Sequence, residues 1–136
     1  MKKTKNFKKE ASKKNRNFPS RKISETLIDF AKPFIDMVDE NTTQDQLETG
    51  FKIAITVWNA VVVEEVKKDP TYLEQLRTNV LEMGENWYYG YAMIESLISR
   101  KKEFFADDLR AIGNFSITYN EGYLHVKAEA RGIAGI

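Results

Sequence analysis

The spacing of hydrophobic residues divides this chain into a helical part and a shorter strand-forming part. From residue 23 to about residue 102, hydrophobic residues recur every three or four positions, which is the spacing of one helix face. After Ala111 hydrophobic and polar residues alternate, as they do along a strand with one buried face. The change of period predicts an α+β domain that is mainly helical, with about four helices and a C-terminal β-hairpin.

Capping and turn residues set the expected bounds of the helices, which are 24–39, 43–68, 70–83 and 86–102. Pro33 interrupts the first helix, but the hydrophobic stripe continues in phase across it, which predicts one kinked helix. Thr43 and Gln46 have the spacing of a capping box at the start of the second helix. Gly84 marks an expected break between the last two helices, the alternative being a single helix that bends at this glycine.

The most hydrophobic run, residues 53–63, is rich in β-branched residues and resembles a strand. Polar residues at spacings of 4, 4 and 3 favour a mostly buried helix instead, namely Glu48, Lys52, Thr56 and Asn59. Trp58 is then expected in the core. Thr56 and Asn59 need hydrogen-bond partners, which we expect among backbone groups near the Pro33 kink, the alternative being that they line a cleft.

The alternation over residues 111–130 predicts a β-hairpin. A three-residue loop would put the hydrophobic residues of the two strands on opposite faces, whereas an even loop pairs Tyr119 with Leu124 and puts them on one face. We therefore expect an even loop. Because a lone hairpin is marginal in water, its hydrophobic face should lie on the helices or join another chain.

Charge is distributed very unevenly along the chain. Residues 1–22 hold ten Lys and Arg against one Glu, a net +9, while residues 23–136 hold 11 basic and 19 acidic residues, a net −8. High charge with few hydrophobic residues predicts that residues 1–22 form a disordered arm attached to a single domain over 23–136. Such a basic arm is typical of binding to a polyanion, and nucleic acid or a ribonucleoprotein is the candidate partner.

The candidate nucleic-acid-binding residues are the cations of the arm, with two phenylalanines that could stack on bases. They are Lys2, Lys3, Lys5, Phe7, Lys8, Lys9, Lys13, Lys14, Arg16, Phe18, Arg21 and Lys22. The alternative is a solvated tail that binds nothing.

Composition excludes several classes of chemistry. Without cysteine the chain has no disulfides, thiol nucleophile or thiolate metal site, which favours an intracellular, cytoplasmic location. The single histidine, His125, cannot make a two-histidine metal site, and we expect it on the surface. With one histidine and no cysteine we expect no metal. No glycine-rich phosphate loop is present, so we expect no nucleotide cofactor, and catalysis is disfavoured. Carboxylates gather beside lysines and arginines at helix ends, where we expect solvated charge: Glu64, Glu65, Asp69, Glu103, Asp107 and Asp108.

The stretch WYYGY, residues 87–91, is the other unusual feature. On a helix, Trp87, Tyr88 and Tyr91 share one face while Tyr89 points away. Together with Trp58 and Asn59 these residues form the candidate ligand-binding region. The alternative is aromatic core packing.

Three functional hypotheses follow from these features. The first is a small non-catalytic interaction protein whose arm contacts nucleic acid. The second is a ligand-binding or enzymatic helical domain that uses the aromatic region. The third is a dimerisation or partner module that pairs through the hairpin edges. The longest hydrophobic run is shorter than the roughly 20 residues that a membrane span needs, so no membrane partner is expected.

Overall fold

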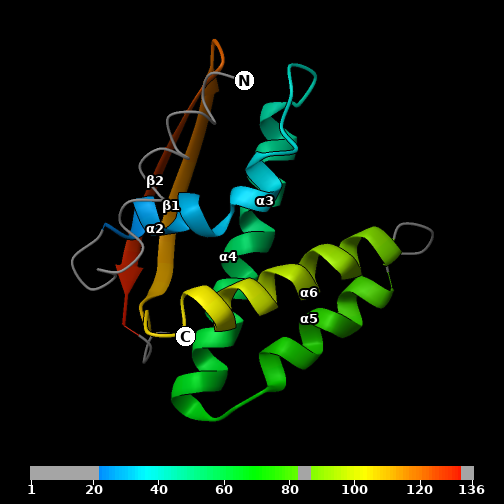
Figure 1. The fold of residues 1–136 in the computed structure, drawn as a ribbon, viewed down its shortest axis with the longest axis vertical. Coiled ribbons are helices and arrows are strands. Elements are labelled where there is room, and N and C mark those ends of the chain that lie inside the picture. The colour runs from blue at the N-terminus through cyan, green and yellow to red at the C-terminus, as the bar shows by residue number, and fades with distance from the viewer. Residues whose placement is uncertain (1–21, 83–86, 133–136) are drawn as a thin grey trace.

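The structure is a computed structural model that describes residues 22–82 and 87–132, without the side chains of residues 87–89. Five helices precede a two-stranded antiparallel hairpin in this part of the chain (Figure 1). The predicted α+β class with a C-terminal hairpin is confirmed.

The first predicted helix is in fact two short ones, so the expectation of one kinked helix over 24–39 is wrong. α2 spans Ile23–Phe30 and α3 spans Lys32–Ile35, with Pro33 in the first turn of α3. Proline has no backbone N–H and its ring clashes with the carbonyl four residues earlier, so the helix ends before it. The carbonyls of Asp29 and Phe30 instead accept hydrogen bonds from Arg100, at 2.8 and 3.0 Å.

α4, Gln44–Lys67, is the longest helix in the described part of the chain and contributes more core residues than any other element there. Its capping box is confirmed: Thr43 Oγ1 accepts a hydrogen bond from the Gln46 amide, and Gln46 Oε1 accepts one from the Thr43 amide. The helix ends at Lys68, whose φ of 54° is left-handed. The run over residues 53–63 is therefore helical, as expected.

α5, Thr71–Leu81, and α6, Trp87–Phe104, run side by side across α4 (Figure 1). A bidentate ion pair between Arg77 and Glu95 joins these two helices. The predicted break near Gly84 lies outside the described residues.

The hairpin consists of β1, Ala111–Asn120, and β2, Tyr123–Arg131. Its loop has two residues, Glu121 and Gly122, with φ of 52° and 82°. Both values are typical of a type I′ turn, whose twist matches that of the strands. Tyr119 pairs with Leu124, so the even loop is confirmed. The hydrophobic residues of both strands pack against the helices: Phe115, Ile117, Tyr119, Leu124, Val126 and Ala128.

Amide side chains of α4 hold the outer edge of β1. Asn59 donates to the Ile112 carbonyl at 2.9 Å and accepts from the Ile112 amide at 2.8 Å. Gln44 likewise donates to the Ile117 carbonyl and accepts from the Tyr119 amide. Each amide thus pairs with the strand backbone as a neighbouring strand would, and the edge of β1 is occupied at these residues.

This contact corrects the partners expected for the polar stripe of α4. Asn59 bonds to β1 and not to backbone groups near Pro33, while the Thr56 hydroxyl bonds to the Lys52 carbonyl within its own helix. Because α4 side chains occupy the edge of β1, the hypothesis that a partner pairs with a hairpin edge now applies to the outer edge of β2.

Trp58 lies at the centre of the core and has no exposed surface. Its ring makes edge-on contacts with Phe30 and Phe105, at centroid distances of 5.2 and 5.7 Å. Its indole N–H donates to the Arg110 carbonyl at 2.7 Å. One side chain of α4 therefore joins α2, the end of α6 and the segment that leads into β1.

We expect Trp58→Ala to lower the free energy of unfolding by about 3–5 kcal/mol, because it empties the centre of the core. Urea denaturation followed by circular dichroism would measure this loss. Tyr72→Ala, which removes an aromatic side chain that is 46% exposed, serves as the control and should change stability by less than about 0.5 kcal/mol. Equal stability of the Trp58 variant and the wild type would contradict this account of the core.

Asn59→Ala should destabilise the protein by about 1–3 kcal/mol, because both Ile112 backbone groups lose a partner. The amide protons of β1 should also exchange faster with solvent, which hydrogen-exchange NMR detects. Thr56→Ala is the matched control from the same polar stripe. Unchanged exchange in β1 of the Asn59 variant would show that this side chain does not hold the strand.

Candidate functional site

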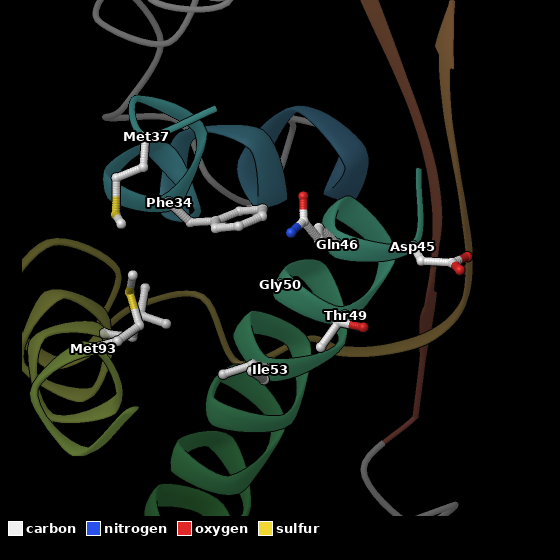
Figure 2. A pocket seen from close by; sticks show the side chains of 9 residues that line it. Phe34, Met37, Asp45, Gln46, Thr49, Gly50, Ile53 and Met93 are labelled. Atoms are coloured by element: carbon white, nitrogen blue, oxygen red, sulfur yellow. The ribbon is translucent and has the colours of Figure 1, made fainter. Parts of the chain in front are cut away.

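An apolar groove lies between α3, the first half of α4, and α6 (Figure 2). Its volume is about 420 Å³, within the range of roughly 300–1,000 Å³ that ligand pockets occupy. The lining side chains are mainly hydrophobic, and the polar ones come from α4. The lining residues are Phe34, Met37, Asp45, Gln46, Thr49, Gly50, Ile53, Met93 and Leu97.

A glycine in the middle of α4 allows one wall of the groove to form. The Phe34 ring lies directly against Gly50, where any Cβ atom would overlap it. The same ring meets Phe51 edge-on at a centroid distance of 5.6 Å. Glycine costs about 1 kcal/mol relative to alanine inside a helix, so its presence there has a packing reason. A glycine in the middle of the predicted helix, Gly50, is thus a signal of this site that the sequence-based predictions missed.

Two methionines face each other across the groove (Figure 2). Met37, just after α3, is 68% exposed, and Met93 on α6 is half-buried. Methionine is unbranched and polarisable, so it adapts its shape to an apolar partner. An apolar group, aromatic ones included, could therefore be held between these two side chains.

The chain around the groove is acidic. Residues 33–51 contain five carboxylates and no Lys or Arg: Asp36, Asp39, Glu40, Asp45 and Glu48. Asp45 lines the groove itself, and Asp36 is paired with Lys32 at 2.9 Å. The groove combines apolar walls with negative surroundings, so it favours a partner that is both apolar and cationic.

A buried charged cluster lies where α6 leads into β1, and it corrects the expectation of solvated charge there. Lys101 has no exposed surface, and its ammonium group donates to the carbonyls of Phe105 and Asp108 at 2.7 and 2.9 Å. It also lies 4.3 Å from the centre of the Trp58 ring, a cation–π contact. Asp108 is buried as well, and its carboxylate is paired with Arg110 at 2.6 Å. The cluster fixes the connection between helix and hairpin.

The pKa of Lys101 is lowered by burial to about 8, although nearby carboxylates oppose the shift. A lowered pKa makes a lysine a better nucleophile, but this amine has no surface at which it could meet a substrate. Lys101 is therefore a structural residue.

The remaining carboxylates of the helix ends do not build a metal site in the described part of the chain. Glu64 is paired with Lys102 at 2.9 Å, and hydrogen bonds from Thr71 lower the pKa of Asp69. Within residues 22–82 and 87–132, no three His, Cys, Asp or Glu side chains gather closely enough to hold a metal ion. His125 is exposed on β2, as expected.

The aromatic region predicted as a ligand site is divided between different surroundings. Trp58 is fully buried and presents no surface to a ligand. Asn59 lies on a smaller hollow of about 290 Å³ between α4 and α5, while Tyr91 is half-buried against the core and hydrogen-bonded to Glu95. The side chains of Trp87, Tyr88 and Tyr89 lie outside the described residues. So do residues 1–21 of the arm, while Lys22 is exposed.

Comparisons of this chain with protein-family models, with curated proteins and with solved structures find no match. Among the described residues, no helix combines the length and the hydrophobicity that crossing a bilayer requires.

Lys101 should make stability depend on pH in the alkaline range. Between its folded pKa of about 8 and its ordinary value of 10.5, the unfolded chain holds a proton that the folded chain has lost. The free energy of unfolding therefore rises with pH across this range. The neutral amine retains two N–H groups, so both carbonyl hydrogen bonds survive deprotonation.

Between about pH 7.5 and about pH 9.5, we expect the free energy of unfolding of the wild type to rise by about 2 kcal/mol more than that of Lys101→Met. Urea titrations of both proteins at the two pH values measure this difference. The contributions of all other titrating groups are the same in both proteins and cancel in the comparison. Parallel pH profiles would show that Lys101 keeps its ordinary pKa despite burial.

Proposed function

We propose that this protein is a small non-catalytic interaction protein whose residues 1–22 bind nucleic acid through attraction to its phosphates. The observation that carries the proposal is the separation of charge, +9 in the first 22 residues against −8 in the rest. A polyanion is attracted to the arm and repelled by the body, so binding is confined to one segment.

The use of polar groups in the body supports binding over catalysis. The buried and half-buried polar side chains named above are engaged with the backbone or with each other: Asn59, Lys101, Asp108 and Arg110. The groove between α3, α4 and α6 is mainly apolar, and its polar lining residues all come from one helix, α4, and not from several elements converging on a substrate. Its chemistry is that of a docking surface.

The arm would bind by releasing counterions from the phosphate backbone. Each lysine or arginine that neutralises a phosphate frees a condensed cation, which makes affinity strongly dependent on salt and largely indifferent to base sequence. Phe7 and Phe18 would add base stacking, which also tolerates any sequence. A cytoplasmic location belongs to the proposal, because nucleic acid is present there and a cysteine-free chain gains nothing from an oxidising compartment.

The salt dependence of nucleic-acid binding tests this proposal. In the full chain, four arm lysines are replaced by glutamine: Lys2, Lys3, Lys8 and Lys9. Fluorescence anisotropy with a labelled single strand, between about 50 and about 200 mM salt, gives the slope of log K against log salt. Each lost phosphate contact lowers the magnitude of this slope by roughly 0.7–0.9, so we expect four substitutions to make it shallower by about 3.

The matched control replaces four exposed lysines of the body by glutamine, which changes the net charge equally: Lys52, Lys67, Lys68 and Lys127. Its slope should equal that of the wild type. Equal losses in both variants would mean that total charge and not the arm governs binding. No salt-dependent binding by the wild type would reject the proposed function.

A further inference from the structure

We propose that the groove between α3, α4 and α6 is the docking site for residues 1–22 of the same molecule. Phe7 lies between Met37 and Met93, and the neighbouring lysines of the arm face the carboxylates along residues 33–51. This inference depends on the groove and on charge, and it stands whether or not the arm also binds nucleic acid.

The walls of the groove fit an aromatic side chain. Phe34, Ile53 and Leu97 form a hydrophobic floor and sides, and the two methionines form adaptable rims. Met37 is more exposed than any other large hydrophobic side chain in the described part of the chain. Covering it would remove apolar surface from water, which stabilises a docked aromatic ring at about 25 cal/mol per Å².

Charge selects which aromatic segment binds there. A neutral hydrophobic peptide would fill the groove but gain nothing from the five carboxylates of residues 33–51, a stretch that itself contains no Lys or Arg. The arm has the complementary composition. Phe7 is flanked by Lys5, Lys8 and Lys9, so one short segment carries both an aromatic ring and three positive charges.

The arm is tethered within reach of the groove. α2 and α3 separate Ile23 from Phe34 by 11 residues, a path of about 17 Å at 1.5 Å per helical residue. The 16 residues from Phe7 to Ile23 span up to about 50 Å when extended. Phe18, five residues from Ile23, spans at most about 16–18 Å, which leaves almost no spare length over this path. The tether supplies a local concentration on the order of millimolar, so even weak docking is substantially populated.

Methyl NMR of the full chain tests the contact directly. The methyl signals of Met37 and Met93 are recorded in wild type, Phe7→Ser and Phe18→Ser. A docked ring shifts nearby methyl signals, so we expect Phe7→Ser to move both signals and Phe18→Ser to leave them in place. Unchanged Met37 and Met93 signals in Phe7→Ser would overturn the docking of Phe7. Shifts caused by Phe18→Ser alone would overturn it equally.

A pair of matched charge variants tests the electrostatic half of the proposal. Asp45→Lys and Glu74→Lys each reverse an exposed carboxylate in the first turn of a helix, so they change net charge and helix-dipole energy alike. Only Asp45 lines the groove. Asp45→Lys should shift the Met37 and Met93 signals towards those of Phe7→Ser, whereas Glu74→Lys should not. Equal effects of the two variants would show that the contact is not specific to the groove.

Spin labelling then distinguishes a contact within one molecule from a contact between copies. The chain lacks cysteine, so Ser96→Cys, exposed on α6 beside Leu97, takes a single nitroxide. Amide signals around Phe7 should lose intensity in this protein. They should lose clearly less intensity with the label at Lys67→Cys, which is about 20 Å further along α4 than Ile53. Loss of intensity in a mixture of isotope-labelled protein and separate spin-labelled protein would show docking between copies and overturn the proposal.

These outcomes are separate from those of the proposed function. Loss of nucleic-acid binding with the methyl contact intact would reject the function alone. Retained salt-dependent binding with no methyl contact would reject the docking site alone.

Discussion

The burial of Trp58 is the constraint on which the rest of this fold depends. Its ring fills the centre of the core between Phe30 and Phe105, and its N–H bonds to the Arg110 carbonyl just before β1. The ammonium group of Lys101 lies over the same ring and bonds to two carbonyls of the turn. One aromatic side chain thereby fixes helix packing and the point at which the hairpin leaves the helices.

The hairpin is attached to the helices by the same helix, α4, that carries Trp58. Two amide side chains of α4, Gln44 and Asn59, pair with the backbone of β1 near its two ends. A two-stranded sheet exposes two edges, and open edges are templates for unwanted pairing. Covering one edge with a helix stabilises a hairpin that would be marginal alone. Among residues 22–82 and 87–132, no further strand pairs with the outer edge of β2.

The unequal charge of residues 1–22, the arm, and residues 23–136, the body, gives these two parts of the chain an electrostatic attraction for each other. The carboxylates that surround the groove would interfere with nucleic-acid binding if they lay on the arm, and the lysines of the arm would find no counterions within a basic body. The same electrostatic attraction can serve both proposals, since a basic aromatic segment suits a phosphate chain and an acidic apolar groove. Nucleic acid and the groove would then compete for one segment, so each would weaken the other's apparent affinity for it.

The sequence by itself determined features that depend on neighbours along the chain. The capping box of Thr43 and Gln46, the even length of the loop between Tyr119 and Leu124, and the change of hydrophobic period all arise within a few residues. Local signals were less decisive at Pro33, where an in-phase stripe predicted a kink but the proline divided the helix in two.

Only the tertiary structure decided which polar residues are buried and what they bind. Lys101 and Asp108 read as solvated charges at a helix end, yet both are buried because the turn folds back over Trp58. Asn59 found its partner at Ile112, 53 residues away, and Trp58 found its acceptor 52 residues away. The groove escaped prediction for the same reason, since its walls come from three helices. Periodicity shows that a side chain is buried, but the choice of partner depends on how separate elements pack, and no short stretch of sequence contains that information.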